Sequence, residues 1–580
     1  MFVEQFAPWL VALNLVAIVL LLVFTRIRPW KIFIASSCVL YMTGLLPLDK
    51  TLAGFSNPSL LVLVLLFFVS MPLERTALVR RLVAAIVNGS VRSSTLKLGV
   101  LGALVSSIVN NTAVVAALLG PLKKQQKIAP SRLLLPLSYA SIIGGTLTLI
   151  GTSTNLIVNG FVQQAGYPPL DFFAFSMIAL PVVLCCLLVM VVIAPWALPK
   201  REIQLNRVTQ EYFLEREVVP GSALIGRSLQ ENGLRRLEKI FLVEVIRGER
   251  VVAPVSPEFV VQAGDVLVFT GDVSAIDLLD EFDGLESPEA FNWTVRDNVR
   301  EVIVSPTANV VGRTIKAVDF RAKFDAAVVA VRRGNERLQG GLGQLVLKAG
   351  DALVLATGPA FQRHNKASSD FIPVGGVDVS RLLSRREELA VYAGFGLIVA
   401  LGATGFVPLL KGLIVLVALL LALRILTVDD IKARFPYELV IVITGALALS
   451  QAVFDSGLSD LIGDFAGEYL GGYGVVGALI GLFLLTWILT ELVTNNAAAA
   501  IIFPLAMAMS SQWGGDYMPF VMAVAFGASA SFLSPYGYQT NLMVYSAGNY
   551  RVVDYVRFGL PVLLVYCTVS LLMIVGHYGL

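Results

Sequence analysis

Two short polar stretches interrupt the long apolar runs of this sequence: SSIVNNT at residues 106–112 and TELVTNN at residues 490–496. Each lies in the middle of a hydrophobic segment, one at 97–119 and the other at 473–511. Irregular polar backbone at membrane depth is tolerated only where protein buries it or where it lines a cavity. The two stretches therefore predict hairpin tips inside a membrane, and both are candidate functional sites.

Composition divides the chain into two membrane parts and a soluble insert. The 580 residues are 56% hydrophobic and 15% charged, whereas soluble domains carry about 25% charged residues. Apolar runs fill residues 1–200 and 386–580, and residues 205–380 have a soluble composition. A spanning helix needs about 20 apolar residues. The candidate spans are 6–25, 31–48, 58–73, 97–119, 132–160, 171–198, 386–406, 408–426, 437–454, 473–490, 494–511, 517–546 and 554–577.

Basic residues predict the orientation of these spans, because cytoplasmic loops are enriched in Lys and Arg. Basic clusters flank the segment 97–119 on both sides, which suits a re-entrant hairpin and not a single crossing. The loops 455–472 and 512–516 contain no Lys or Arg, so both are expected outside. The segment 473–511 then enters and leaves from the outside. The two halves are predicted to be inverted repeats, with the insert in the cytoplasm.

A second pair of motifs supports this repeat: GTSTNL at 151–156 and GYQTNL at 537–542. Asn155 follows Asn111 by 44 residues, and Asn541 follows Asn495 by 46. Broken helices at matching positions of two halves are the best sequence pointer to a transporter's binding site. Small polar residues also mediate ordinary helix packing in membranes, but four related breaks favour function. Glu491 either binds a coupling ion or proton or, more simply, braces its hairpin.

The two polar tips and the two breaks resemble those of the divalent-anion/sodium symporter family, over about 1–200 and 386–580. That resemblance implies an all-α polytopic membrane protein that works as a homodimer. It also implies a sodium-coupled secondary active symporter that carries a dianion by alternating access. It implies sodium sites built from Ser106, Asn110, Asn111, Gly151, Thr490, Asn495 and Gly537. It implies a substrate site near Asn111, Thr112, Thr152, Asn495, Asn496 and Tyr538.

The match to that family is incomplete, and the departures bear on the substrate. Neither tip carries the family's Ser-Asn-Thr signature intact, and Tyr538-Gln539 replaces a small residue and Pro. The stretch SPYGYQTNLMV at 534–544 is most similar to members described as sulfate permeases. The expected substrate is therefore sulfate or another small oxyanion, and a dicarboxylate such as succinate, malate or citrate is the alternative.

The insert contains a tandem repeat with a constant offset of 86 residues. Gly226 matches Gly312, Arg247 matches Arg333, and Asp265 matches Asp351. Short β-strands with turns are expected in each copy, which makes the insert β-rich α+β. The copies, at 205–290 and 291–380, resemble the C-terminal ligand-binding (TrkA-C) module of potassium-conductance regulators. A sensor for a nucleotide, an ion or a metabolite and a passive dimerisation module both remain open.

Other classes of protein fit the sequence less well. A ligand-gated channel would need a repeated filter sequence, and an ATP-driven pump would need a Gly-rich phosphate loop ending in Gly-Lys-Ser/Thr. The four cysteines lie in apolar runs without metal-ligand spacing, and the chain has only two histidines. No enzyme and no cofactor other than sodium is expected. The net charge of +3 gives no reason to expect nucleic acid as a partner, so the expected partners are lipid and a dianion, in the plasma (inner) membrane.

Overall fold

The computed structural model describes residues 6–25, 27–74, 90–125, 127–201, 213–234, 240–248, 250–252, 255–271, 282–286, 299–305, 308–334, 336–338, 342–357, 361, 370–373, 383–513 and 516–580. The chain forms two compact units. The first unit comprises 1–200, 380–544 and 552–580, and the second comprises 201–379 with 545–551. Residues 75–89, which contain basic residues that precede the segment 97–119, and the expected boundaries at 205, 290 and 380 lie outside the described residues.

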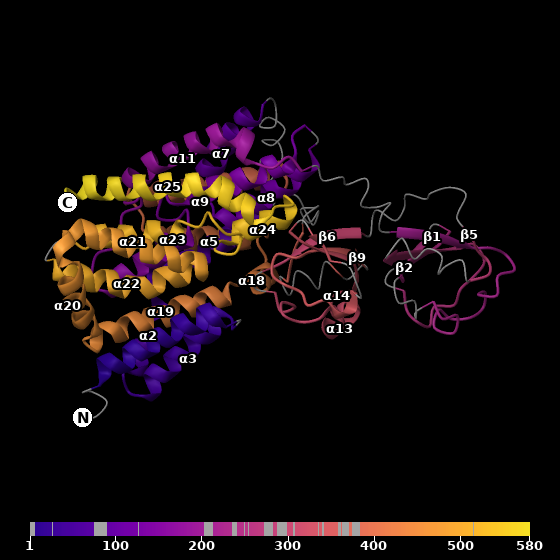
Figure 1. Ribbon diagram of the computed structural model, residues 1–580, viewed down its shortest axis with the longest axis horizontal. Coiled ribbons are helices and arrows are strands. Elements are labelled where there is room, and N and C mark those ends of the chain that lie inside the picture. Colours follow the sequence, from indigo (N-terminus) through magenta and orange to yellow (C-terminus); the bar gives the residue numbers. More distant parts are fainter. Residues whose placement is uncertain are drawn as a thin grey trace. The chain divides into compact units, whose positions relative to one another are not determined.

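The first unit is helical in both of its halves (Figure 1). Before the insert its helices are α2 (Ala7–Phe24), α3 (Pro29–Met42), α4 (Leu48–Ala53), α5 (Pro58–Glu74), α7 (Val91–Ser106), α8 (Asn111–Lys124), α9 (Leu134–Gly145), α10 (Ser153–Gln164) and α11 (Ser176–Ala197). After the insert they are α16 (Arg385–Ala403), α17 (Leu409–Ala422), α18 (Val428–Arg434), α19 (Tyr437–Asp455), α20 (Leu458–Leu470), α21 (Gly474–Leu492), α22 (Asn495–Gln512), α23 (Met518–Ser529), α24 (Gln539–Ala547) and α25 (Val552–Tyr578).

Six helical segments in the described part of the chain are long and apolar enough to span a membrane. They are Ala7–Phe24, Leu48–Leu73, Ser176–Ala197, Tyr437–Asp455, Gly474–Leu492 and Val552–Tyr578. The expected spans 408–426 and 517–546 contain shorter apolar helices, Leu409–Ala422 and Met518–Ser529. This pattern is that of a multi-pass membrane protein.

Both polar stretches lie at the turn of a helical hairpin. Helix α7 ends at Ser106 and α8 begins at Asn111, and the two helices pack side by side. Helix α21 ends at Leu492 and α22 begins at Asn495, again in mutual contact. Helix α9 packs along α7 and α23 packs along α21, so each hairpin is accompanied by the first helix of a broken pair.

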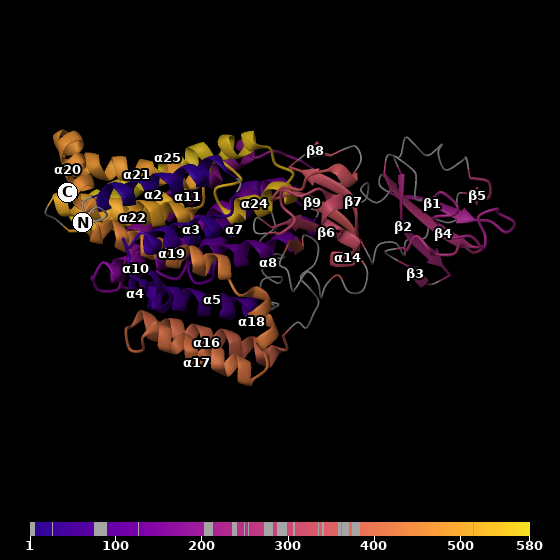
Figure 2. The same ribbon diagram turned by 90° about the horizontal axis from the view of Figure 1, so that it is seen from below.

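Two long segments are broken as the sequence predicts. Residues 146–152 separate α9 from α10, and residues 530–538 separate α23 from α24. The segment 455–472 differs from its expectation, because it is not a plain loop and contains α20. The apolar residues Leu458, Leu461, Ile462 and Phe465 follow the spacing of a helix face. Helix α20 packs on α22, whereas α16 and α17 pair beside α5 (Figure 2).

The second unit contains two five-stranded antiparallel sheets with the same strand order. The first sheet runs β3 (Arg250–Val252), β2 (Ile240–Arg247), β4 (Asp265–Gly271), β1 (Phe213–Val218) and β5 (Leu285–Glu286). The second runs β8 (Glu336–Arg337), β7 (Ala326–Arg333), β9 (Ala352–Thr357), β6 (Val299–Val304) and β10 (Phe371–Pro373). Two short helices, α13 (Ile315–Val318) and α14 (Phe320–Phe324), precede β7. Strand for strand, the sheets follow the offset of 86.

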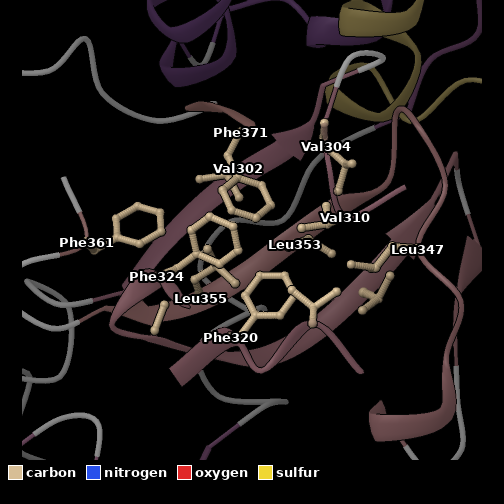
Figure 3. Packing of buried hydrophobic residues seen from close by; sticks show 14 residues of the cluster. Val302, Val304, Val310, Phe320, Phe324, Leu347, Leu353, Leu355, Phe361 and Phe371 are labelled. Carbon is tan, nitrogen blue, oxygen red and sulfur yellow. The ribbon is translucent and has the colours of Figure 1, made fainter. Parts of the chain in front are cut away.

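Each sheet buries one face in a core of its own. Figure 3 shows the core of the second sheet, where the rings of Phe320, Phe324 and Phe371 pack over Val302 and Leu355. A third, smaller cluster joins the two sheets and contains Ile246, Val268, Val329 and Ala356. The soluble unit is thus two like sheets, each with its own core, that share an apolar contact.

Candidate functional site

The first tip holds a pair of buried side chains at the start of α8. Ser106 is fully buried, and its hydroxyl donates to Asn111 Oδ1 at 2.5 Å. Asn110 plays a different part, because its side-chain oxygen accepts the backbone N–H of Thr112 at 3.0 Å and caps the helix. The sequence places Asn110 among the ion ligands, and the structure uses its side chain as a helix cap.

The second tip is built in a similar way from different residues. Thr494 caps α22 by accepting the backbone N–H of Ala497 at 3.3 Å. The hydroxyl of Thr490 is buried and donates to the carbonyl oxygen of Ala528 at 3.3 Å. Asn495 and Asn496 therefore begin α22 just after a cap, as Asn111 begins α8 just after Asn110.

The Asn of each Thr-Asn-Leu motif holds its own break together. Asn155 Nδ2 donates to the carbonyl of Thr148 at 2.9 Å, and Asn541 Nδ2 donates to that of Ser534 at 3.3 Å. In both cases the acceptor lies seven residues before the Asn. Asn541 also donates to the carbonyl of Ser531 at 2.9 Å. These side chains satisfy backbone groups that the broken helices leave without helical partners.

Each break contacts the tip of the other half. Ser153 Oγ donates to Asn496 Oδ1 at 3.0 Å, and Thr112 Oγ1 donates to Gln539 Oε1 at 3.3 Å. The offsets relate these pairs to one another, because Gln539 follows Ser153 by 386 residues and Asn496 follows Thr112 by 384. The same kind of contact is therefore made twice, with the roles of the two halves exchanged.

Tyr538 lies where the two breaks meet. Its hydroxyl accepts from Asn111 Nδ2 at 2.7 Å and lies 3.1 Å from Thr152 Oγ1. Asn495 Nδ2 donates to Thr154 Oγ1 at 2.8 Å. The sequence nominates six residues for the substrate, and all of them take part in contacts between a tip and a break or between the two breaks: Asn111, Thr112, Thr152, Asn495, Asn496 and Tyr538. None of these side chains is charged.

Oxygen atoms gather at the two glycines of the breaks. A Cβ on Gly151 would lie 2.5 Å from the carbonyl oxygen of Gly145 and 2.9 Å from that of Ser106. A Cβ on Gly537 would meet Ser531 Oγ first, then the carbonyl oxygen of Thr490 at 3.2 Å and Glu491 Oε2 at 3.3 Å. Only glycine leaves both places open, and unwound carbonyls and hydroxyls of this kind suit a sodium ion.

Several residues of the site are absent from the sequence prediction. Among them are Gly145, Ser153, Ser531 and Gln539. The sequence signal that could have identified them is the constant offset of 386 residues, which relates Gly145 to Ser531 and Ser153 to Gln539. Gly145 precedes Gly151 by six residues, as Ser531 precedes Gly537. Glu491 does brace its surroundings, because its Oε1 accepts the backbone N–H groups of Phe532 and Leu533 at 2.9 and 3.0 Å.

Several known proteins similar to this chain are named as transporters or cotransporters. The family described as citrate transporter, CitMHS, matches residues 19–518. A Chlamydomonas reinhardtii protein with the name "Putative sulfur deprivation response regulator" is 30% identical over 91% of this chain and 94% of its own length. Sodium/sulfate cotransporter 1 of the same organism is 28% identical over 61% of this chain and 42% of its own length.

Among solved structures, the YdaH transporter of Alcanivorax borkumensis aligns over 99% of this chain and 98% of its own, at 12% identity and a TM-score of 0.44. The family match covers most of the chain, and the multi-pass helices and paired polar breaks agree with it. The protein therefore belongs to the CitMHS citrate transporter family and is a membrane transporter of anions.

Proposed function

We propose that this chain is a sodium-coupled symporter of a small divalent oxyanion, with sulfate as the first candidate, that works by alternating access. The observation that carries the proposal is the exchange of contacts between tips and breaks, Ser153 with Asn496 and Thr112 with Gln539. Groups from both halves meet at one place, so a movement of one half changes that place. Alternating access around a central site needs such an arrangement.

Charge balance supports sodium as the partner ion. The polar side chains that meet at the tips are neutral, so they offer a dianion hydrogen bonds and no compensating positive charge. Bound sodium would supply that charge. The first sodium site would be at Ser106, Asn111 and Gly151, next to the cap Asn110, and the second at Thr490, Asn495 and Gly537. Both lie beside the residues proposed for the substrate.

Tyr538 supports a small substrate over a large one. Its ring is buried, and its hydroxyl joins Asn111 to Thr152 where a dianion would bind. A tetrahedral oxyanion needs less room than a dicarboxylate, and a relative named sodium/sulfate cotransporter agrees with this preference. The family's description as citrate transporter favours the alternative, a sodium/dicarboxylate symporter.

The proposal extends to the arrangement of the chain. The two halves would be inverted repeats whose hairpins, α7–α8 and α21–α22, are re-entrant, in a homodimer in the plasma membrane. The second unit would be a cytoplasmic pair of TrkA-C-like modules with a regulatory ligand. Its two sheets of equal strand order support a tandem of modules. A ligand would regulate transport only if it binds one transport state better than another.

The test is uptake of labelled sulfate by the purified full-length protein in liposomes, with and without an inward sodium gradient. Asn111→Ala should lower sodium-driven uptake by at least about tenfold, because it removes hydrogen bonds to Ser106 and Tyr538. Asn14→Ala is the matched control, since Asn14 bonds Ser36 between α2 and α3, away from the tips. Sulfate uptake at the same rate with and without the sodium gradient would refute sodium coupling. Uptake of succinate but not sulfate would favour the sodium/dicarboxylate symporter.

A further inference from the structure

The two glycine clusters differ in charge. In the first half the atoms that face Gly151 include the carbonyl oxygens of Gly145 and Ser106. In the second half the atoms that face Gly537 are a hydroxyl, a carbonyl and a carboxylate oxygen, from Ser531, Thr490 and Glu491. By sequence offset Ser531 replaces Gly145, and Glu491 replaces Ser107. The second cluster alone of the two contains a carboxylate.

The second cluster also contains polar atoms whose hydrogen-bonding capacity is unused. Ser531 is fully buried, and its hydroxyl makes no hydrogen bond to the described residues. Ser534 hydrogen-bonds to the Glu491 carboxylate. The carboxylate oxygen Oε2 is buried and has no further hydrogen-bond partner among the described residues. A buried hydroxyl or carboxylate oxygen without a partner is costly, so their convergence on one point calls for a ligand.

We propose that Glu491 Oε2, Ser531 Oγ and the carbonyl oxygen of Thr490 are ligands of a monovalent cation beside Gly537. The inference deepens the proposed function, because it rests on the second sodium site and gives that site a charged ligand. One carboxylate among neutral oxygens balances the charge of a sodium ion. An acidic side chain at membrane depth has a functional role by default.

Glu491 can hold the break by hydrogen bonds and bind a cation at the same time, because it uses a different carboxylate oxygen for each role. Its Oε1 holds the backbone N–H groups of Phe532 and Leu533, which fixes the carboxylate against the break. That leaves Oε2 directed at the point beside Gly537. In the described part of the first half, no carboxylate joins the tip to the break at this place. There the hydroxyl of Thr148 in the break donates to the carbonyl oxygen of Ser107 in the tip at 2.5 Å. Because only the second cluster contains a carboxylate, the cation would be held more tightly there than at the first cluster.

Sodium-dependent thermal stability tests this assignment in the full-length protein purified in detergent, with KCl replacing NaCl at constant ionic strength. Glu491→Gln keeps an oxygen for the two backbone N–H groups, removes the charge and replaces the proposed ligand oxygen Oε2 with an NH2 group that cannot bind a cation. It should raise the sodium concentration for half-maximal stabilisation by about tenfold or more. Ser531→Ala removes the hydroxyl without touching the brace and should raise that concentration as well. Ser107→Ala, at the matching place of the first half, should leave it within about twofold.

The outcomes separate this inference from the proposed function. If wild type is stabilised by sodium and both Glu491→Gln and Ser531→Ala keep its midpoint, the carboxylate site is refuted and sodium coupling stands. If sodium gives wild type no more stabilisation than potassium, the coupling falls and this site falls with it. If Glu491→Gln fails to fold, Ser531→Ala decides alone, because an unchanged midpoint in that variant refutes the site.

Discussion

The soluble unit contains two like sheets, and the membrane unit contains two matching sets of a polar tip and a helix break. The two pairs resemble each other in different features. In the soluble unit the copies share strand order, register and scaffold contacts. Arg247 binds Asp265 through Nε at 2.6 Å, and Arg333 binds Asp351 in the same way at 2.7 Å. Even the register irregularity recurs, between Leu242 and Glu244 in β2 and 86 residues later in β7.

In the membrane unit the halves instead share the contacts that they make with each other. In the pairs Ser153–Asn496 and Thr112–Gln539, a residue at a break of one half contacts a residue at the tip of the other. The residue types differ between the two pairs, but all four side chains are polar. Each sheet of the soluble unit has its own core, whereas each membrane half needs the other to complete its polar site. The two sheets are therefore alike in the contacts within each sheet, whereas the two membrane halves are alike in the contacts between them.

The largest effect is expected from the two arginine–aspartate bridges. Arg247→Ala or Arg333→Ala leaves a carboxylate that is almost fully buried, that of Asp265 or Asp351, without its cation. Breaking a fully buried pair from one side costs about 3–5 kcal/mol. The lower end of that range is expected here, because each arginine is partly exposed and each aspartate keeps a backbone N–H bond. Hydrogen exchange of the full-length protein should show loss of protection in β4 for the first variant and in β9 for the second.

The comparison also predicts that this loss stays local. Each bridge lies within one sheet, and each sheet has its own core. Equal loss of protection in both sheets after one substitution would contradict the independence of the two copies. Arg313→Ala, which removes an arginine outside the bridges, serves as the control.

A place where the copies differ gives the next effect. Glu244 in β2 is fully buried, and the matching residue of β7 is Ala330. Burial, with a smaller contribution from the charge of Glu215, raises the pKa of Glu244 from 4.5 to about 7. Above pH 4.5 the unfolded chain loses this proton while the folded sheet keeps it. Stability should therefore fall as pH rises from about 4.5 to about 7, by about 3 kcal/mol, and then level off.

Comparison of hydrogen exchange at pH 5 and pH 8 checks this, after correction for the intrinsic exchange rates. Protection of β2 and β4 should fall at the higher pH relative to that of β7 and β9. Glu244→Gln should abolish the difference, because the amide does not titrate. An equal response of both sheets in wild type would assign the pH dependence to some other group.

The sequence predicts the local features of this fold well. Helix breaks, polar tips and the offset of 86 are visible because they depend on residues close together or on exact repetition. The tips lie at 107–110 and 493–494 between helices, and the breaks lie at 146–152 and 530–538. These are the places where Gly, Ser, Thr and Asn gather in apolar runs.

The sequence does not predict which side chains of the site contact one another, and the reason is physical. Thr112 and Gln539 are 427 residues apart, and no local pattern encodes which polar group meets which. Asn110 shows the same limit, because an Asn at a tip is equally suited to bind an ion or to cap a helix. Helix α20 departs from the prediction for a different reason. The lack of Lys and Arg in 455–472 indicates the side of the membrane and not the secondary structure, whereas its apolar spacing is that of a helix face.

The asparagines of the two breaks should give a moderate effect in the membrane unit. Asn155→Ala removes a hydrogen bond to the carbonyl of Thr148, and Asn541→Ala removes bonds to two carbonyls and one from Ser138 Oγ, at 2.7 Å. Buried groups left without partners cost about 1–3 kcal/mol. Thermal unfolding in detergent should show both variants destabilised, Asn541→Ala more than Asn155→Ala. The reverse order would mean that the two breaks are not held as described.

The smallest effect compares two glycines that occupy the same turn of the two sheets. Gly248 has φ +60° and Gly334 has φ +58°, so alanine meets the same backbone strain, about 1 kcal/mol, at either place. A Cβ on Gly248 meets nothing within 4 Å, whereas one on Gly334 lies 2.6 Å from Tyr545 Oη and 3.0 Å from the carbonyl oxygen of Tyr550.

Gly334→Ala should therefore cost about 1 kcal/mol more than Gly248→Ala, because overpacking adds to the shared strain. Hydrogen exchange at the ends of β7 and β2 measures both costs in the full-length protein, each variant being the control of the other. Arg332 Nη2 donates to the carbonyl of Ser546 at 2.8 Å in the same region, so Arg332→Ala should loosen it as well. If Gly248→Ala costs as much as Gly334→Ala, segment 545–551 does not pack against this turn, and the two sheets are more alike than their contacts indicate.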